Sequence, residues 1–102
     1  MYAVIRDNTL EPVKAPAETD SFEEFQAAHA GQPGYSGTVI VDLGEGRQLS
    51  LTLWRSEEEA EAARVALGPV IKRTLQPLMR KPSTLVGRGK VLFNDLSEDA
   101  AP

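Results

Sequence analysis

Two alternating runs of residues around Gly44-Glu45-Gly46 constrain the fold of this chain more than any other feature. The segment GTVIVDLGEGRQLSLTLW, residues 37–54, alternates apolar and polar side chains on both sides of the glycines, which is typical of a β-hairpin. A three-residue loop, in which glycine is free to adopt positive φ, then gathers the aliphatic side chains on one face. The predicted cross-strand pairs are Val41 with Leu49 and Val39 with Leu51. The other face carries Thr38, Ile40, Ser50, Thr52 and Trp54.

Two capping boxes, each a Ser followed three residues later by a Glu, predict where helices start. Ser21 and Glu24 place one helix start near Phe22, and Ser56 and Glu59 place another directly after the hairpin. Within the second helix, Gly68-Pro69 predicts a break because proline lacks the backbone N–H that a helix interior needs.

Strands are predicted at both ends of the chain. The run YAVI at residues 2–5 is β-branched, and the run STLVGRGKVLFNDL at residues 83–96 contains two glycines that suggest a bulge. The order of elements is therefore βαββαβ, which predicts an α+β ferredoxin-like fold with one antiparallel sheet and both helices on one face. One domain over residues 1–96 and a flexible tail at residues 97–102 are expected.

This arrangement leaves one face of the sheet uncovered. If the helices cover the aliphatic face of the hairpin, the open face contains Ile40 and Trp54, and water would touch an apolar patch in a monomer. Symmetric association of two sheets removes such a patch, so the chain is expected to form a homodimer.

Composition limits the classes of function. The 102 residues carry a formal net charge of −4, so neither nucleic acid nor an anionic membrane surface is an expected partner. Cysteine is absent, which removes disulfides, thiolate nucleophiles and cysteine-based metal sites. No segment is apolar enough to span a bilayer, and a cytoplasmic location is the default expectation.

The stretch GYSGTVIVDLGEGRQLSLTLWRSEEEAEAA resembles the antibiotic biosynthesis monooxygenase family of dimeric α/β barrels. The resemblance lies in Pro33-Gly34 before the hairpin and in a Trp followed by a Ser/Glu-rich helix start. It implies a homodimer in which each subunit keeps a pocket, between its own sheet and helices, for a small planar organic molecule. In some members this pocket performs oxygenation without a cofactor, and in others it degrades haem. The pocket can lie on the helix side of the sheet, whereas the parity of the hairpin puts Trp54 on the other side, and both placements stay open.

The resemblance also points to candidate site residues. It matches Trp54 to the Trp at the strand end and Asn8 to an Asn late in the first strand; both are catalytic candidates because each is a neutral donor for a developing oxyanion. Thr52, Arg73 and His29 are candidate ligand-binding residues. Haem-degrading members add a His where this chain offers Arg73 or Lys72, so haem breakdown by that arrangement is not expected.

Each candidate also has a purely structural interpretation. Trp54 can be a packing residue with its N–H bonded to a backbone carbonyl, and Asn8 can begin a turn. His29 falls on the same helical stripe as Phe22 and Phe25, where an imidazole helps packing, and a lone His is poor evidence for a metal site. No cofactor and no metal are therefore predicted.

Two functions remain open. One is a cofactor-independent monooxygenase that acts on a small planar or aromatic molecule. The other is a non-catalytic dimeric barrel that binds a small molecule or serves a structural role. A convergent acid/base pair in the Trp54 pocket would separate the two, and the sequence alone identifies none.

Overall fold

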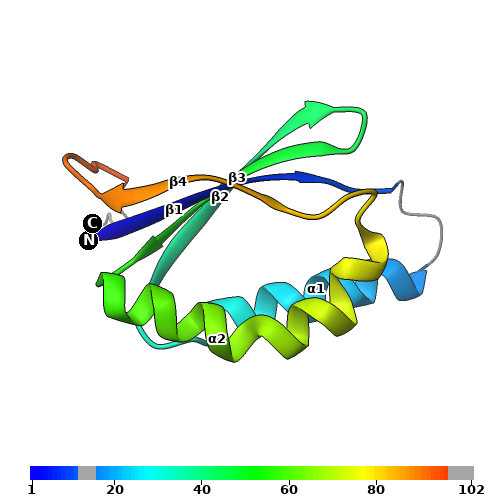
Figure 1. Cartoon of the computed structure of the whole chain (residues 1–102), viewed down its shortest axis with the longest axis horizontal. Helices are drawn as coiled ribbons and strands as arrows, with labels where there is room; N and C mark the ends of the chain where they lie inside the picture. The colour runs from blue at the N-terminus through cyan, green and yellow to red at the C-terminus, as the bar shows by residue number, and fades with distance from the viewer. Residues whose placement is uncertain (12–15, 97–102) are drawn as a thin grey trace.

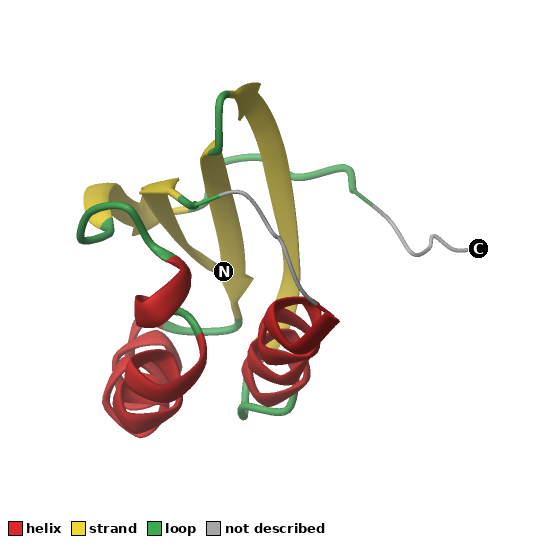
Figure 2. Ribbon diagram, turned by 90° about the vertical axis from the view of Figure 1, so that its right-hand side faces the viewer, coloured by secondary structure: helices red, strands yellow, loops and turns green. Residues whose placement is uncertain are grey.

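The computed structural model describes residues 1–11 and 16–96, so the predicted tail at residues 97–102 lies outside the described residues. The four strands form one antiparallel sheet in the order β2-β3-β1-β4, and both helices pack against the same face of it (Figures 1 and 2). The predicted ferredoxin-like βαββαβ fold is thus confirmed. In chain order the elements are β1 (Tyr2–Thr9), α1 (Pro16–Ala30), β2 (Tyr35–Gly44), β3 (Arg47–Trp54), α2 (Glu57–Thr74), the 3-10 helix η1 (Gln76–Leu78) and β4 (Thr84–Lys90). Within the described residues, neither helix is both long and apolar enough to cross a bilayer.

The β2–β3 hairpin keeps the predicted pairs, Val39 with Leu51 and Val41 with Leu49. The predicted three-residue loop is wrong, because Gly44 ends β2 and pairs with Arg47, which leaves Glu45 and Gly46 as the turn. An irregularity between Asp42 and Gly44 keeps the earlier pairs in register, and φ is positive at Gly44, Glu45 and Gly46. At Gly46 a side chain would collide with the carbonyl oxygen of Leu10, so glycine is required there for close approach as well as for backbone conformation.

The two predicted helix starts have opposite outcomes. Ser56 caps α2 as expected, since its Oγ accepts a hydrogen bond from the backbone N–H of Glu59 at 3.2 Å. The predicted start near Phe22 is wrong, because α1 begins at Pro16 and Ser21 lies inside the helix. Proline suits a first helical position, where its missing N–H has no partner in any case.

The predicted break at Gly68-Pro69 is also wrong, because α2 continues through both residues to Thr74. Pro69 removes one backbone hydrogen bond from the helix. Buried residues lie on either side of it, Leu67 before and Thr74 after, and the Thr74 hydroxyl donates to the Val70 carbonyl at 2.6 Å. Tertiary packing therefore holds the helix together across a residue that disfavours it.

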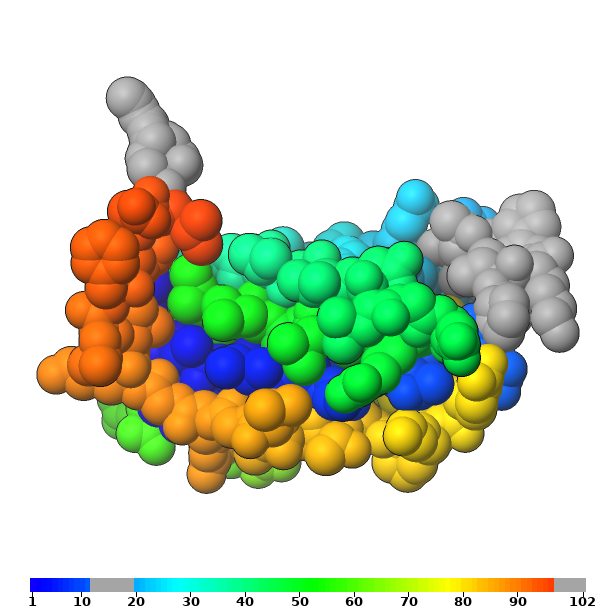
Figure 3. Space-filling view, turned by 90° about the horizontal axis from the view of Figure 1, so that it is seen from above, coloured from blue at the N-terminus to red at the C-terminus, as the bar shows by residue number. Residues whose placement is uncertain are grey.

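The two faces of the sheet are assigned the opposite way from the sequence expectation. Trp54 and Ile40 lie on the face that the helices cover, and Trp54 packs with Ala60 and Ala63 of α2. The aliphatic side chains of the hairpin lie on the open face, which Figure 3 shows from above. The expectation failed because it assumed that the more aliphatic face must be the covered one.

A bulge in β4, which its glycines suggested, positions one edge of the covered face. Ile5 pairs with Gly87, whereas the next residue of β1, Arg6, pairs with Leu85, so Val86 is the extra residue. Leu85 and Arg88 are three residues apart, and without the bulge they would point to opposite faces. With it, both line the space between the sheet and the helices.

Candidate functional site

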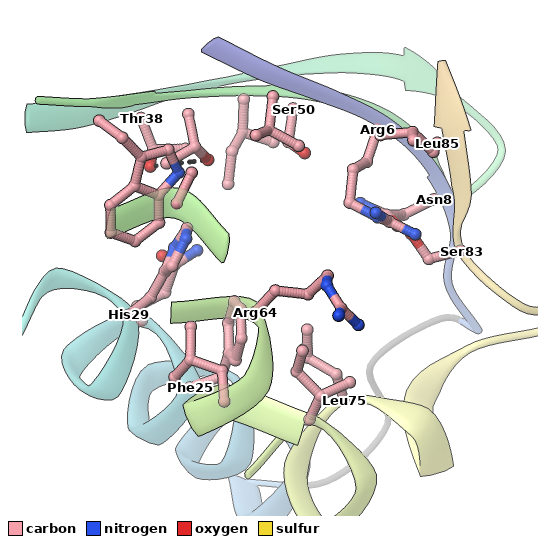
Figure 4. Close-up of a pocket in the computed structure, with 18 of the residues that line it drawn as sticks. Arg6, Asn8, Phe25, His29, Thr38, Ser50, Arg64, Leu75, Ser83 and Leu85 are labelled. Atoms are coloured by element: carbon pink, nitrogen blue, oxygen red, sulfur yellow. Dashed lines mark hydrogen bonds between the residues drawn. The ribbon is translucent and has the colours of Figure 1, made fainter. Parts of the chain in front are cut away.

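A cavity of about 430 Å³ lies between the covered face of the sheet and the two helices. Each of the four strands and both helices contribute side chains to its wall (Figure 4). Trp54, Asn8, Thr52 and His29, four of the five residues predicted for the site, line this one cavity. Their chemical roles stay predictions, but the fold brings them into a shared space of a size that suits a small organic molecule.

Aromatic rings gather at one end of the cavity. Trp54 is only 3% exposed, and the centroid of the His29 ring lies 5.6 Å from it. His29 also stacks on Phe25 at 5.2 Å and meets the edge of Tyr35 at 5.3 Å. These contacts hold the imidazole in one place between α1 and β3, with little freedom to turn towards water.

The indole N–H of Trp54 donates to no acceptor among the described residues. A buried N–H without a partner is costly, and tryptophan offers a donor only. The alternative interpretation, in which this N–H is bonded to a backbone carbonyl, therefore has no support within the described part of the chain. Because Trp54 lines the cavity, an acceptor on a bound molecule would satisfy the donor.

A chain of three hydroxyl groups ends beside the same rings. The Tyr35 hydroxyl donates to Thr38 Oγ1 at 2.9 Å, and Thr38 Oγ1 donates to Thr52 Oγ1 at 3.2 Å. Thr52 is buried and lines the cavity. Since its oxygen accepts a hydrogen bond, its own proton is available to an oxygen atom of a ligand.

His29 supplies the titratable group at this end. Burial lowers the pKa of His29 below its usual value of 6.5, so the neutral imidazole is the favoured form at neutral pH. A neutral imidazole can accept a proton, and within the described residues no side chain is hydrogen-bonded to the ring. His29 is therefore an available base at the aromatic end of the cavity.

The opposite end of the cavity is cationic and polar. Arg6 Nε donates to Ser83 Oγ at 2.8 Å, and Asn8 lies close to this pair (Figure 4). Asn8 pairs with Gln48 across the sheet, whereas Trp54 pairs with Tyr2, six residues earlier along β1. This separation is about 20 Å of strand, so Asn8 and Trp54 cannot donate to the same oxygen atom.

Carboxylates partly neutralise the positive charge of the cavity wall. Arg64 of α2 forms an ion pair with Glu61, with Arg64 Nε 3.1 Å from Glu61 Oε2, and Arg88 lies 3.7 Å from the same carboxylate. These contacts lower the pKa of Glu61, chiefly through the hydrogen bonds from Arg64. Arg6 has no ion-pair partner among the described residues.

Arg73, the fifth predicted site residue, lies elsewhere. Its NH1 donates to Glu24 Oε2 at 2.6 Å, and its side chain is more than half exposed on the surface where α2 meets α1. Arg73 does not line the cavity, so its predicted role in ligand binding stays a prediction.

Sequence reasoning missed Arg6 and Arg64. For Arg6 a signal was present, because Arg6 and Asn8 are two residues apart on one strand and must share a face. For Arg64 the sequence held no indication of a role in the site, because charged residues in a helix rich in both acidic and basic side chains usually face water. Among the described residues, no group of three or more acidic, His or Cys side chains could hold a metal ion.

No family model matches this sequence, and no curated protein matches it either. Similar solved structures nevertheless exist. SnoaB, a cofactor-independent oxygenase from Streptomyces nogalater, superposes with a TM-score of 0.66 at 17% identity, covering 94% of this chain and 97% of that one. An antibiotic biosynthesis monooxygenase gives a TM-score of 0.69 at 14% identity, with coverages of 90% and 99%. A protein of unknown function from Nitrosomonas europaea gives 0.72 at 12%, with coverages of 94% and 93%.

These likenesses establish the fold along nearly the full length of the chains. The fold is that of the antibiotic biosynthesis monooxygenases, as the sequence resemblance implied. A shared fold does not fix a reaction, which has to be argued from the site itself.

Proposed function

We propose that this protein is a cofactor-independent monooxygenase that oxidises a small planar aromatic molecule inside the cavity. The observation that carries the proposal is the juxtaposition at the aromatic end: a partly buried, neutral imidazole on His29 lies beside the ring of Trp54, whose indole N–H has no protein acceptor in the described chain. A base and an oxyanion donor are the two groups that such a reaction asks of a protein.

The chemistry balances with molecular oxygen as the only co-reactant. His29 removes a proton from a ring CH2 group that is conjugated to a carbonyl, which leaves an electron-rich enolate. The enolate passes one electron to O2 and the two radicals combine, forming a C–O bond and, after protonation, a hydroperoxide. Loss of water from the hydroperoxide converts the former CH2 into C=O, with one oxygen atom in the product and one in water.

Trp54 and Thr52 are assigned the donor role in this sequence. Their N–H and O–H groups stabilise the enolate oxygen without protonating it, because both are neutral and weakly acidic. The enclosing helices keep water away, which strengthens these hydrogen bonds.

We further propose that the protein acts as a homodimer that associates through the open face of the sheet. Val39, Val41 and Leu43 are 45%, 46% and 47% exposed on this face, and two of the side chains beyond β4, Leu92 and Phe93, are 94% and 81% exposed. An aliphatic sheet face of this kind suits an isologous contact with a second copy. A cytoplasmic location stays part of the proposal, supported by the absence of cysteine.

Oxygen consumption with anthrone as the probe tests the activity. Anthrone has a ring CH2 conjugated to a carbonyl, and its oxidation to anthraquinone is followed by absorbance and, with 18O2, by product mass. Protein dialysed against EDTA should accelerate the reaction over buffer and should place one labelled oxygen in the quinone. His29→Phe keeps an aromatic ring on Phe25 and removes the base, so the rate should fall by about 100-fold or more.

Saturable binding of anthrone without any acceleration of its oxidation would reject the enzyme and favour a non-catalytic binding protein. An unchanged rate in His29→Phe would remove His29 from the mechanism. Phe25→Leu is the matched control, because it alters the same stacked pair of rings while leaving the imidazole in place.

A further inference from the structure

The two ends of the cavity differ in chemistry, and the proposed oxygenation uses only the residues of the aromatic end. Figure 4 shows His29 and Phe25 on one side and Arg6, Asn8 and Ser83 on the other, with the guanidinium of Arg64 reaching into the space from α2. An oxygenation at the aromatic end makes no use of this second group of residues. The cationic end therefore requires an explanation of its own.

Arg6 is held in position but is not neutralised. Its Nε donates to Ser83 Oγ at 2.8 Å, which fixes the plane of the guanidinium, while its two terminal amino groups have no acceptor among the described residues. Ser83 precedes β4 and Arg6 lies within β1, so the pair is anchored by two adjacent strands. A fixed, planar pair of N–H donors is the arrangement that binds a carboxylate through two parallel hydrogen bonds.

The neighbouring charges make an anion more favourable at this position. Burial and the nearby charge of Arg64 both lower the pKa of Arg6, which nevertheless stays protonated. The cavity wall contains three arginines, Arg6, Arg64 and Arg88, against two glutamates, Glu57 and Glu61. One positive charge is thus left over in the wall of a chain whose net charge is −4, and a monoanion would balance it.

We infer that the cavity takes an aromatic carboxylic acid, with its ring at the Trp54 end and its carboxylate on the terminal amino groups of Arg6. This inference rests on the proposed function, since it names the substrate class of the same cavity. Arg6 pairs with Ser50 across the sheet and Trp54 lies four residues further along β3, a separation of about 13 Å. A fused ring system that bears a carboxylate can span this separation, whereas a single ring cannot.

A matched pair of probes tests the charge directly. Naphthalene-2-carboxylate and naphthalene-2-carboxamide have nearly the same shape, and at pH 8 only the first is an anion. Binding is measured by quenching of Trp54 fluorescence and by calorimetry. The wild-type protein should bind the carboxylate about tenfold or more tightly than the amide, as expected for charge-assisted hydrogen bonds.

Arg6→Gln should abolish this preference, because it should weaken binding of the carboxylate about tenfold or more and binding of the amide much less. Arg47→Gln removes the same charge from β3 at a position where the arginine pairs with Asp7 on the surface, and it should keep the preference. Arg6→Lys keeps the positive charge but lacks the planar guanidinium, so it should retain part of the preference for the carboxylate. Circular dichroism verifies the fold of each variant.

Equal affinity of the wild-type protein for the two probes would overturn this inference and leave the proposed oxygenase intact. Equal weakening of both probes by Arg6→Gln would also overturn it, because Arg6 would then serve the structure of the cavity. Failure of the wild-type protein to bind either probe would count against an aromatic-binding cavity and so against the proposed function as well. The comparison of the two probes on the wild-type protein needs no variant.

Discussion

The two faces of the sheet reverse the usual relation between polarity and burial. The face covered by helices carries Arg6, Asn8, Ser50 and Thr52 among its side chains, while the face open to water is aliphatic along the β2–β3 hairpin. An antiparallel sheet normally buries its apolar face and exposes its polar one. Under the proposals made above, the covered face encloses a space for a polar ligand, and the open face is the surface that a second copy of the chain covers.

Trp54 is the most buried apolar side chain of the covered face, and it packs this face against α2. It is 3% exposed and packs with Ala60, Ala63 and Leu67 of α2. Trp54→Ala should therefore lower the free energy of unfolding by about 3 to 5 kcal/mol, measured by chemical denaturation. Val65→Ala, on the exposed side of the same helix, should change it by less than about 0.5 kcal/mol. A loss below about 2 kcal/mol for Trp54→Ala would mean that the ring lines the cavity more than it packs in the core.

On the open face we expect the opposite effect: a charged side chain should prevent dimerisation without unfolding the subunit. Val41→Lys should weaken the dimer about 100-fold, because the substitution would bury a lysine without a partner at the proposed interface. Analytical ultracentrifugation should then detect a folded species at the monomer mass of 11.1 kDa. Val65→Lys places the same charge on an exposed position of α2 and should leave the dimer intact. A wild-type protein that is already monomeric at micromolar concentration would refute the proposed dimer.

The contrast between the faces also explains what the sequence could predict. The order of elements, the cross-strand pairs of the hairpin and the cap at Ser56 depend on local spacing, and all three are confirmed. The start of α1 and the continuity of α2 through Pro69 depend on packing between distant segments, and both were predicted wrongly. Periodicity identifies two faces of a strand but does not state which one the helices cover.

The site was predictable only in part for the same reason. Trp54 and Thr52 lie two residues apart on β3 and share a face whichever side the helices take. His29 reaches the same cavity because α1 packs over that face. The helical stripe of Phe22, Phe25 and His29 indicated that this side of α1 packs, but not which face of the sheet it covers. The cationic end combines residues from β1, β4 and α2, and no local pattern in the sequence brings these three segments together.

His29 makes the covered face sensitive to pH. Its pKa is lowered from 6.5 in the folded state, so below pH 6.5 the unfolded chain binds more protons than the folded one. The contribution of His29 to the free energy of unfolding should be fully present above pH 6.5. It should decrease as the pH falls below 6.5, with a slope of at most about 1.4 kcal/mol per pH unit. His29→Phe should show a shallower slope between pH 5 and 7 in denaturation experiments. Identical slopes would indicate that the imidazole is accessible to water in the folded state.

The smallest expected effect concerns the hydroxyl chain on the covered face, and it separates groups that hold the fold from groups that serve the ligand. Thr38→Val removes the hydrogen bonds to both Tyr35 and Thr52, and should cost about 1 kcal/mol of unfolding free energy. Thr52→Val removes only the second bond and should cost about half as much, yet it should slow anthrone oxidation more than Thr38→Val does, because the lost proton is the one available to the enolate. Denaturation and initial rates on the same two variants measure both quantities. If the rates fall in the same order as the stabilities, the hydroxyl of Thr52 belongs to the fold and the donor role at the aromatic end falls to Trp54 alone.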